Sequence, residues 1–228
     1  MTKSIILRVA KLFAGLFLYA VGIVMTINAN LGLAPWEVFH QGISKTVGIT
    51  MGQASIAMGF VLIVLNGFFG EKLGWGTLSN MLFIGIFMDI LMLNNLIPVF
   101  PGFFPGLLML LTGIFVIGIA TVFYMGAGFG SGPRDGLMVA LKKRTGKSIR
   151  FIRNSMEITV LIMGYLLGGF VGAGTLITSI TVGYIVQFVF RLFKFDATEV
   201  ENRFIYEDIN YIKNLIKEKK DSSSEENL

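Results

Sequence analysis

Long apolar stretches separated by short polar ones make up most of this chain. A helix that crosses the hydrocarbon layer needs about 20 mostly apolar residues. Six stretches reach that length within a few residues: 9–29, 51–70, 74–94, 103–127, 155–171 and 172–190. They are continuously apolar, whereas the strands of a membrane barrel alternate. The pattern therefore predicts an all-α polytopic membrane protein with six transmembrane helices, because lipid leaves backbone groups no partner outside a helix.

The two halves of the chain align without a gap when the sequence is shifted by 98 residues. The shift places Gly32 on Gly130, Pro35 on Pro133, and the string Gly74-x-Gly76-Thr77-Leu78 on Gly172-x-Gly174-Thr175-Leu176. Each half contains three predicted spans, and an odd number reverses the second half. We therefore predict two inverted three-helix repeats, 1–98 and 99–195, and a tail over 196–228. Inverted repeats are a common plan of secondary transporters.

Composition supports the membrane assignment. Apolar types form 54% of the residues and charged types 14%, against about 25% charged in soluble domains, and the mean hydropathy is +0.74. These values exclude an ordinary soluble domain and a disordered chain. Cysteine is absent and there is a single histidine, His40, so we expect no disulfide, no metal site and no cofactor.

The distribution of positive charge predicts the topology. Lys and Arg gather before the first span and in the segment 134–153, whereas the alternate loops carry few. Because cytoplasmic loops are rich in Lys and Arg, we expect a multi-pass protein of the cell membrane with both termini in the cytoplasm. The basic segment is expected to contact anionic lipid head groups rather than nucleic acid.

Several strings resemble a known group of proteins. They are LGLAPWEVFHQGI at 31–43, GSGPRDGLM at 130–138, GWGT at 74–77 and GAGT at 172–175. These strings resemble the YczE/YyaS/YitT group of bacterial integral membrane proteins. The resemblance covers about residues 10–195 and implies a bacterial inner-membrane protein. It implies neither a substrate nor a catalytic residue.

The aligned segments Pro35-Trp36-Glu37 and Pro133-Arg134-Asp135 each have the pattern of a helix start. Proline suits the first helical position, and an acid two residues later complements the helix dipole. Each segment therefore predicts a short helix of about ten residues, which is interfacial or re-entrant. Two interpretations stay open: the residues only start a helix, or they line a polar path. Arg134 could pair with its neighbour Asp135.

Polar residues inside the spans are further candidates. Asp89 lies two-thirds along the third span, and Gln187 is its partner in the repeat. Ionisable residues there are costly and are candidate functional sites, with hydrogen bonding inside the bundle as the alternative. Glu157 is expected to pair with Arg153, four residues earlier. His40 is expected to be an interfacial residue without a chemical role.

The tail has apolar residues at helical spacing, at Ile205, Ile209, Ile212 and Ile216. This spacing predicts an amphipathic helix, and the Ser/Glu-rich end 221–228 is expected to be disordered.

Three functions remain open. A transporter or permease for a small solute or ion would use a path lined by Pro35, Trp36, Glu37, Asp89, Pro133, Arg134, Asp135 and Gln187. A non-transporting accessory protein would instead dock or regulate another enzyme through the basic segment and the tail. An intramembrane enzyme is disfavoured, because the sequence shows no metal cluster, nucleophile–base pair or carboxylate dyad. A homodimer is an alternative to a monomer in each case.

Overall fold

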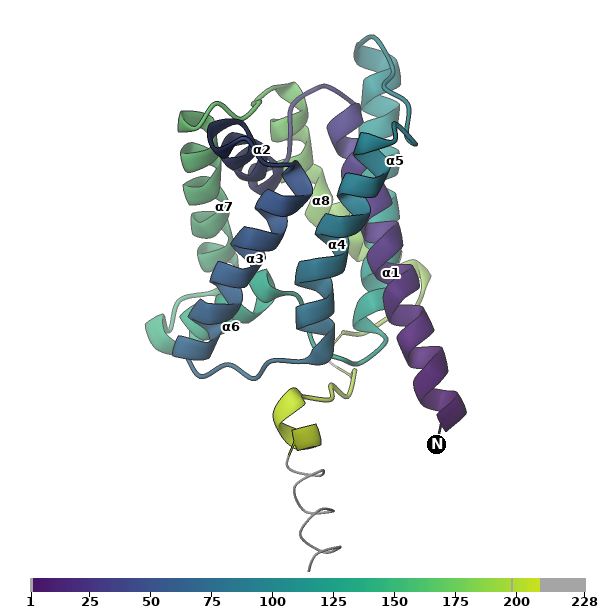
Figure 1. The fold of residues 1–228 in the computed structure, drawn as a ribbon, viewed down its shortest axis with the longest axis vertical. Helices are drawn as coiled ribbons and strands as arrows, with labels where there is room; N and C mark the ends of the chain where they lie inside the picture. Colours follow the sequence, from purple (N-terminus) through teal and green to yellow (C-terminus); the bar gives the residue numbers. More distant parts are fainter. Residues whose placement is uncertain (1, 198, 210–228) are drawn as a thin grey trace, which may run out of the picture.

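The computed structural model describes residues 2–197 and 199–209. These residues form eight helices joined by short connections (Figure 1). In chain order the helices are α1 (Thr2–Asn28), α2 (Pro35–Val47), α3 (Met51–Phe68), α4 (Trp75–Leu93), α5 (Phe103–Met125), α6 (Pro133–Thr145), α7 (Ile149–Leu166) and α8 (Ala173–Leu192). A single further helical turn covers 205–209. The prediction of an all-helical membrane protein is confirmed.

Five described helices are long and apolar enough to cross a membrane: α1, α3, α4, α5 and α8. Helix α7 has 18 residues but includes Arg150, Arg153 and Glu157. It begins earlier than the predicted span over 155–171, because Ser148 caps it by accepting a hydrogen bond from Phe151 N. Its role as a sixth span stays a prediction. Large apolar side chains such as Phe60, Leu108 and Ile180 are exposed on the bundle surface, where lipid would cover them.

The same order of four helices occurs twice, and several features recur 98 residues apart. Helices α2 and α6 begin and end at equivalent positions, and so do α3 and α7. Both short helices start at the proline that the sequence indicates and end before a left-handed glycine, Gly48 or Gly146, as expected for C-terminal caps. Helix α2 lies at one end of the bundle and α6 at the other (Figure 1).

Helices α1 and α5 form the most extensive contact between two helices. Glycines let their backbones approach: a Cβ atom on Gly22 would lie 2.8 Å from the Gly113 carbonyl oxygen. Such small residues are typical of membrane helix interfaces. Helix α4 packs on α1 and α8 packs on α5, whereas α2 and α6 each contact both α3 and α7. The buried core includes Leu16, Val24, Leu110 and Ile114.

The Gly-x-Gly-Thr strings join the two halves by backbone contacts. Gly76 N donates to the Phe129 carbonyl oxygen at 2.7 Å, and Gly174 N donates to the Leu31 carbonyl oxygen at 2.6 Å. A Cβ atom on Gly74 would overlap the same Phe129 oxygen. The glycines are therefore needed for close backbone approach.

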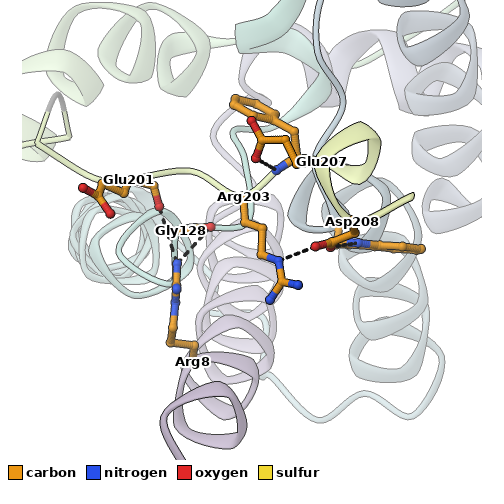
Figure 2. Close-up of polar contacts among 8 residues, drawn as sticks. Arg8, Gly128, Glu201, Arg203, Glu207 and Asp208 are labelled. Carbon is orange, nitrogen blue, oxygen red and sulfur yellow. Dashed lines mark hydrogen bonds and ion pairs between the residues drawn. The ribbon is translucent and has the colours of Figure 1, made fainter. Parts of the chain in front are cut away.

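The segment 199–209 lies against the end of the bundle that holds the N-terminus (Figure 2). Arg8 donates to the carbonyl oxygens of Gly128 and Glu201, and Arg203 N donates to the Gly128 oxygen at 3.0 Å. Asp208 pairs with Arg203 and accepts a hydrogen bond from Trp75 Nε1 at 2.9 Å. This part of the tail is therefore tied to the bundle. The predicted helix beyond 209 and the predicted disorder of 221–228 lie outside the described residues.

Candidate functional site

A partly open cavity of about 190 Å³ lies between the helices, and every described helix from α1 to α7 contributes to its lining. Its apolar lining includes Met58, Leu62 and Ile84, which pack in or against the hydrophobic core. Its polar lining is unusual for an apolar bundle, because ionisable groups at membrane depth are costly. The polar side chains are those of Tyr19, His40, Ser55, Asn80, Tyr124, Arg134, Asp135, Arg153 and Glu157.

The two Pro-x-acid segments meet at this cavity. Trp36, Pro133, Arg134 and Asp135 line it directly. The Arg134 guanidinium carbon lies 4.3 Å from the centre of the Trp36 ring, and Arg134 Nη2 lies 3.9 Å from Glu37 Oε1. Cations over an aromatic face are attracted by its quadrupole. Arg134 therefore joins α6 to α2 and does not simply pair with its neighbour Asp135.

The two acids of these segments have different surroundings. Glu37 is buried, with 6% of its surface exposed, and Arg134 is its ion-pair partner. Asp135 is half-buried, and the Tyr124 hydroxyl lies 3.5 Å from its Oδ2 atom. The ring of Tyr19 packs edge-on against Tyr124, with their centroids 6.0 Å apart. The 98-residue shift aligns Glu37 with Asp135, but the structure places their carboxylates in unequal environments.

Arg153 and Glu157 form the ion pair that their spacing predicts. Arg153 Nε lies 3.0 Å from Glu157 Oε1 on α7. The charges of this pair are mutually compensated at the edge of the cavity, and the prediction is confirmed.

His40 is buried within the protein, and its predicted depth at the membrane interface stays a prediction. The imidazole is 1% exposed and lines the cavity, and its Nδ1 atom has no hydrogen-bond partner among the described residues. The reason is the direction of α2, whose first two turns pack into the bundle against α3 and α7. Buried polar atoms normally have a partner, and this nitrogen is one of three buried side-chain atoms in the described residues that lack one.

The structure does not bring Asp89 or Gln187 to the cavity. Asp89 accepts hydrogen bonds from Thr50 Oγ1 and from Gly52 N, the latter at 2.9 Å, at the start of α3. It therefore caps a helix, the alternative left open by the sequence. Gln187 is exposed on α8. Pro35 is buried and starts α2 without lining the cavity.

Tyr19 and Tyr124 are cavity residues that the sequence pattern did not indicate. Both lie within long apolar helices. Tyrosine in membrane proteins is enriched at the interfaces. A tyrosine in the middle of an apolar helix is therefore unusual, and this pattern could have indicated both residues. Asn80, a polar residue inside the apolar helix α4, carries a similar signal.

A second cavity, of about 340 Å³, adjoins the first at Gly132. Asn66, Thr77 and Lys143 contribute to it, and Asn202 and Phe204 of the C-terminal segment contribute to its wall. Asn66 Nδ2 donates to the Pro133 carbonyl oxygen at 2.8 Å, while its Oδ1 atom has no partner among the described residues. No group of three His, Asp or Glu residues in the described part of the chain is placed to hold a metal ion.

Comparison with known proteins gives relatives of similar length. The chain is 35% identical over 192 residues to "Uncharacterized membrane protein YczE" of Bacillus subtilis strain 168. This alignment covers 82% of the chain and 87% of the relative. It is 32% identical over 184 residues to an "Uncharacterized protein" of Haemophilus influenzae strain KW20 Rd, covering 81% and 84%. It is 27% identical over 168 residues to "Uncharacterized protein YyaS" of Bacillus subtilis, covering 72% and 83%.

No solved structure matches the chain. Residues 6–191 match the family described as "Family of unknown function (DUF6198)". This match covers most of the chain and includes both Pro-x-acid segments. Together with the resemblance to YczE, it shows that the chain is an integral membrane protein of the DUF6198 family.

Proposed function

We propose that this protein is a transporter or permease for a small solute or ion, and that the polar cavity is its binding site. The observation that carries this proposal is the position of Arg134, Asp135 and His40 around an internal space of about 190 Å³. A volume of that size is equivalent to about six molecules of liquid water. An occupant would therefore be small.

The proposed architecture is a pair of inverted three-span repeats, with the cavity between them. It is supported by the features that recur 98 residues apart and by the places of α2 and α6 at opposite ends of the bundle. Secondary transporters of this plan bind their solute near the midplane, at the interface of the repeats. We further propose that the basic end of the bundle, with both chain termini, faces the cytoplasm.

The contacts of α2 and α6 support alternating access. Helix α2 packs so closely on α7 that a Cβ atom on Gly164 would lie 2.5 Å from Phe39 N. At the equivalent contact of α6 with α3, the Asn66 side chain lies between Gly136 and the α3 backbone. The α2–α7 contact is thus made by close backbone packing, and the equivalent α6–α3 contact is made by a polar side chain. Loosening of each contact in turn would open the cavity first to one side and then to the other.

The test is flux through reconstituted vesicles. The purified full-length protein is placed in proteoliposomes, and a mixture of small ions, amines, amino acids and carboxylates is screened for uptake and release. We expect a protein-dependent flux that Glu37→Gln and Arg134→Ala abolish at equal protein content. The variant Asp89→Asn, which changes a carboxylate outside the cavity, should retain it. A wild-type flux equal to that of empty vesicles for every solute would contradict the proposal.

A second candidate is the accessory function, and one observation favours it. The residues 142–150 are all exposed and include Lys142, Lys143, Arg144, Lys147 and Arg150. Such a surface suits an anionic lipid or an acidic partner. If docking is the function, neutral substitutions at Lys142 and Arg144 will change the cellular phenotype, while Glu37→Gln will not.

A further inference from the structure

We infer that the cavity binds a small monovalent cation, either an alkali ion or the ammonium group of an amine, at a corner formed by Asn80, Tyr124 and Asp135 beside Gly132. The inference rests on the proposed function in one respect: the bound cation would be the solute or its coupling ion.

The corner is defined by three side-chain oxygen atoms that lie around the position where a Cβ atom on Gly132 would stand. The position that a Cβ atom would take there lies 3.5 Å from Asn80 Oδ1 and 3.6 Å from both Asp135 Oδ2 and Tyr124 Oη. These atoms come from α4, α6 and α5 and therefore converge only in the folded bundle. Carboxylate, amide and hydroxyl oxygens are acceptors for ammonium groups and ligands for hard cations.

The charges around the cavity leave one carboxylate without a close cation. Arg134 lies against Glu37 and Trp36, and Arg153 is paired with Glu157. Among the described residues, no Lys or Arg nitrogen lies within 4.0 Å of the Asp135 carboxylate. Both arginines also act on Asp135 at longer range. The three carboxylates and two guanidinium groups together leave a formal charge of −1, which favours a monovalent cation, because divalent cations are usually held by more carboxylates.

The other half of the chain lacks an equivalent corner. The position equivalent to Gly132 is Ala34, and the position equivalent to Asn80 is Thr178. The equivalent acid, Glu37, already faces Arg134. The structure therefore assigns a single cation site, on the α6 side of the cavity.

Gly132→Ala is the sharpest variant for a test. Gly132 has φ −63° and ψ 160°, which alanine adopts without strain, and the added methyl would meet its neighbours only at ordinary contact distances. The substitution therefore leaves the fold intact, fills the corner and reproduces the residue found at position 34. Asp135→Asn removes the charge, and Asp89→Asn is the matched control outside the cavity.

The experiment is isothermal titration of the purified full-length protein in detergent with methylammonium chloride and, separately, with sodium chloride, in a buffer whose cation is N-methylglucamine. We expect saturable binding of at least one probe, which identifies the source of the cation. Asp135→Asn and Gly132→Ala should each weaken it by about tenfold or more, the loss expected for one hydrogen bond to a charged group. Asp89→Asn should bind as the wild type does.

Two results would overturn the inference: no saturable binding of either probe to folded wild-type protein, or equal affinity in wild type, Asp135→Asn and Gly132→Ala. Flux measurements separate this inference from the proposed function. Cation binding without flux in vesicles would end the transport proposal and leave the site standing. If the protein transports a solute, and neither cation nor the Asp135→Asn substitution changes that flux, the cation site is ruled out and the transport proposal stands.

Discussion

The Arg134 guanidinium lies over the indole ring of Trp36, with its central carbon 4.3 Å from the ring centroid. These residues occupy the second positions of α6 and α2, and 98 residues separate them in the chain. Two equivalent positions of a repeat can touch only close to the axis that relates them. The contact therefore indicates where a pseudo-two-fold axis would pass, and it joins unlike residues, so the charge at the cavity is asymmetric.

Removal of Arg134 should destabilise the protein through Glu37. The Glu37 carboxylate is buried, and Arg134→Ala would leave it without its ion-pair partner. We expect a loss of roughly 2 kcal/mol in the free energy of unfolding, a value below that of a fully buried pair because Arg134 is partly exposed. Adding Glu37→Gln should recover about half of it. Chemical denaturation in detergent measures both, and strictly additive effects would show that the pair is uncoupled.

Alanine at the Gly-x-Gly-Thr strings should prevent correct folding. A Cβ atom on Gly74 or Gly172 would overlap a carbonyl oxygen of the other half, at Phe129 and Leu31 respectively. Gly67 and Gly183 lie in helices with nothing within 4 Å of the added atom, so alanine there should be neutral or stabilise by up to about 1 kcal/mol. Size-exclusion chromatography of the four variants gives the comparison. A monodisperse Gly74→Ala protein of wild-type stability would show that this backbone contact is dispensable.

Asp89→Asn should affect stability and leave transport unchanged. Asp89 accepts hydrogen bonds at the N-terminus of α3, where a negative charge is favourable. The amide keeps one acceptor and loses the charge, so we expect a loss of about 1 kcal/mol. Thermal unfolding and vesicle flux, measured on the same preparation, check both halves of this prediction. If Asp89→Asn abolishes flux without changing stability, the prediction is wrong and Asp89 belongs to the solute path.

Single cysteines at Lys45 and Lys143 should react from opposite sides of the membrane. The chain has no cysteine of its own, so each introduced thiol is a unique label. Lys45 lies near the end of α2 and Lys143 near the end of α6, at the two ends of the bundle. In intact cells a membrane-impermeant maleimide should label Lys45→Cys, while Lys143→Cys should react only after permeabilisation. Equal labelling of both in intact cells would refute the inverted threading.

Features that depend on a few neighbouring residues were predictable from the sequence. The apolar runs gave the long helices, Pro35 and Pro133 gave the starts of the short ones, and the spacing of Arg153 and Glu157 gave their ion pair. Each of these acts within one or two helical turns, so the chain itself contains the whole interaction.

The membership of the cavity was only partly predictable. Trp36, Arg134 and Asp135 were candidates from their pattern, but Tyr19 and Tyr124 were not, and His40 was expected at the interface. For Arg134, pairing with the adjacent Asp135 was one alternative, but its side chain lies against Trp36 and Glu37 of the other half.

The sequence by itself determined that this is a helical membrane protein, where its two short helices start and that its halves share a pattern. Only the tertiary structure decided that Asp89 caps a helix while Asp135 faces a cavity. The physical reason is that helix formation in an apolar stretch is a local requirement of the backbone. Which side chains share a space depends on how all the helices pack, and no local pattern encodes that arrangement.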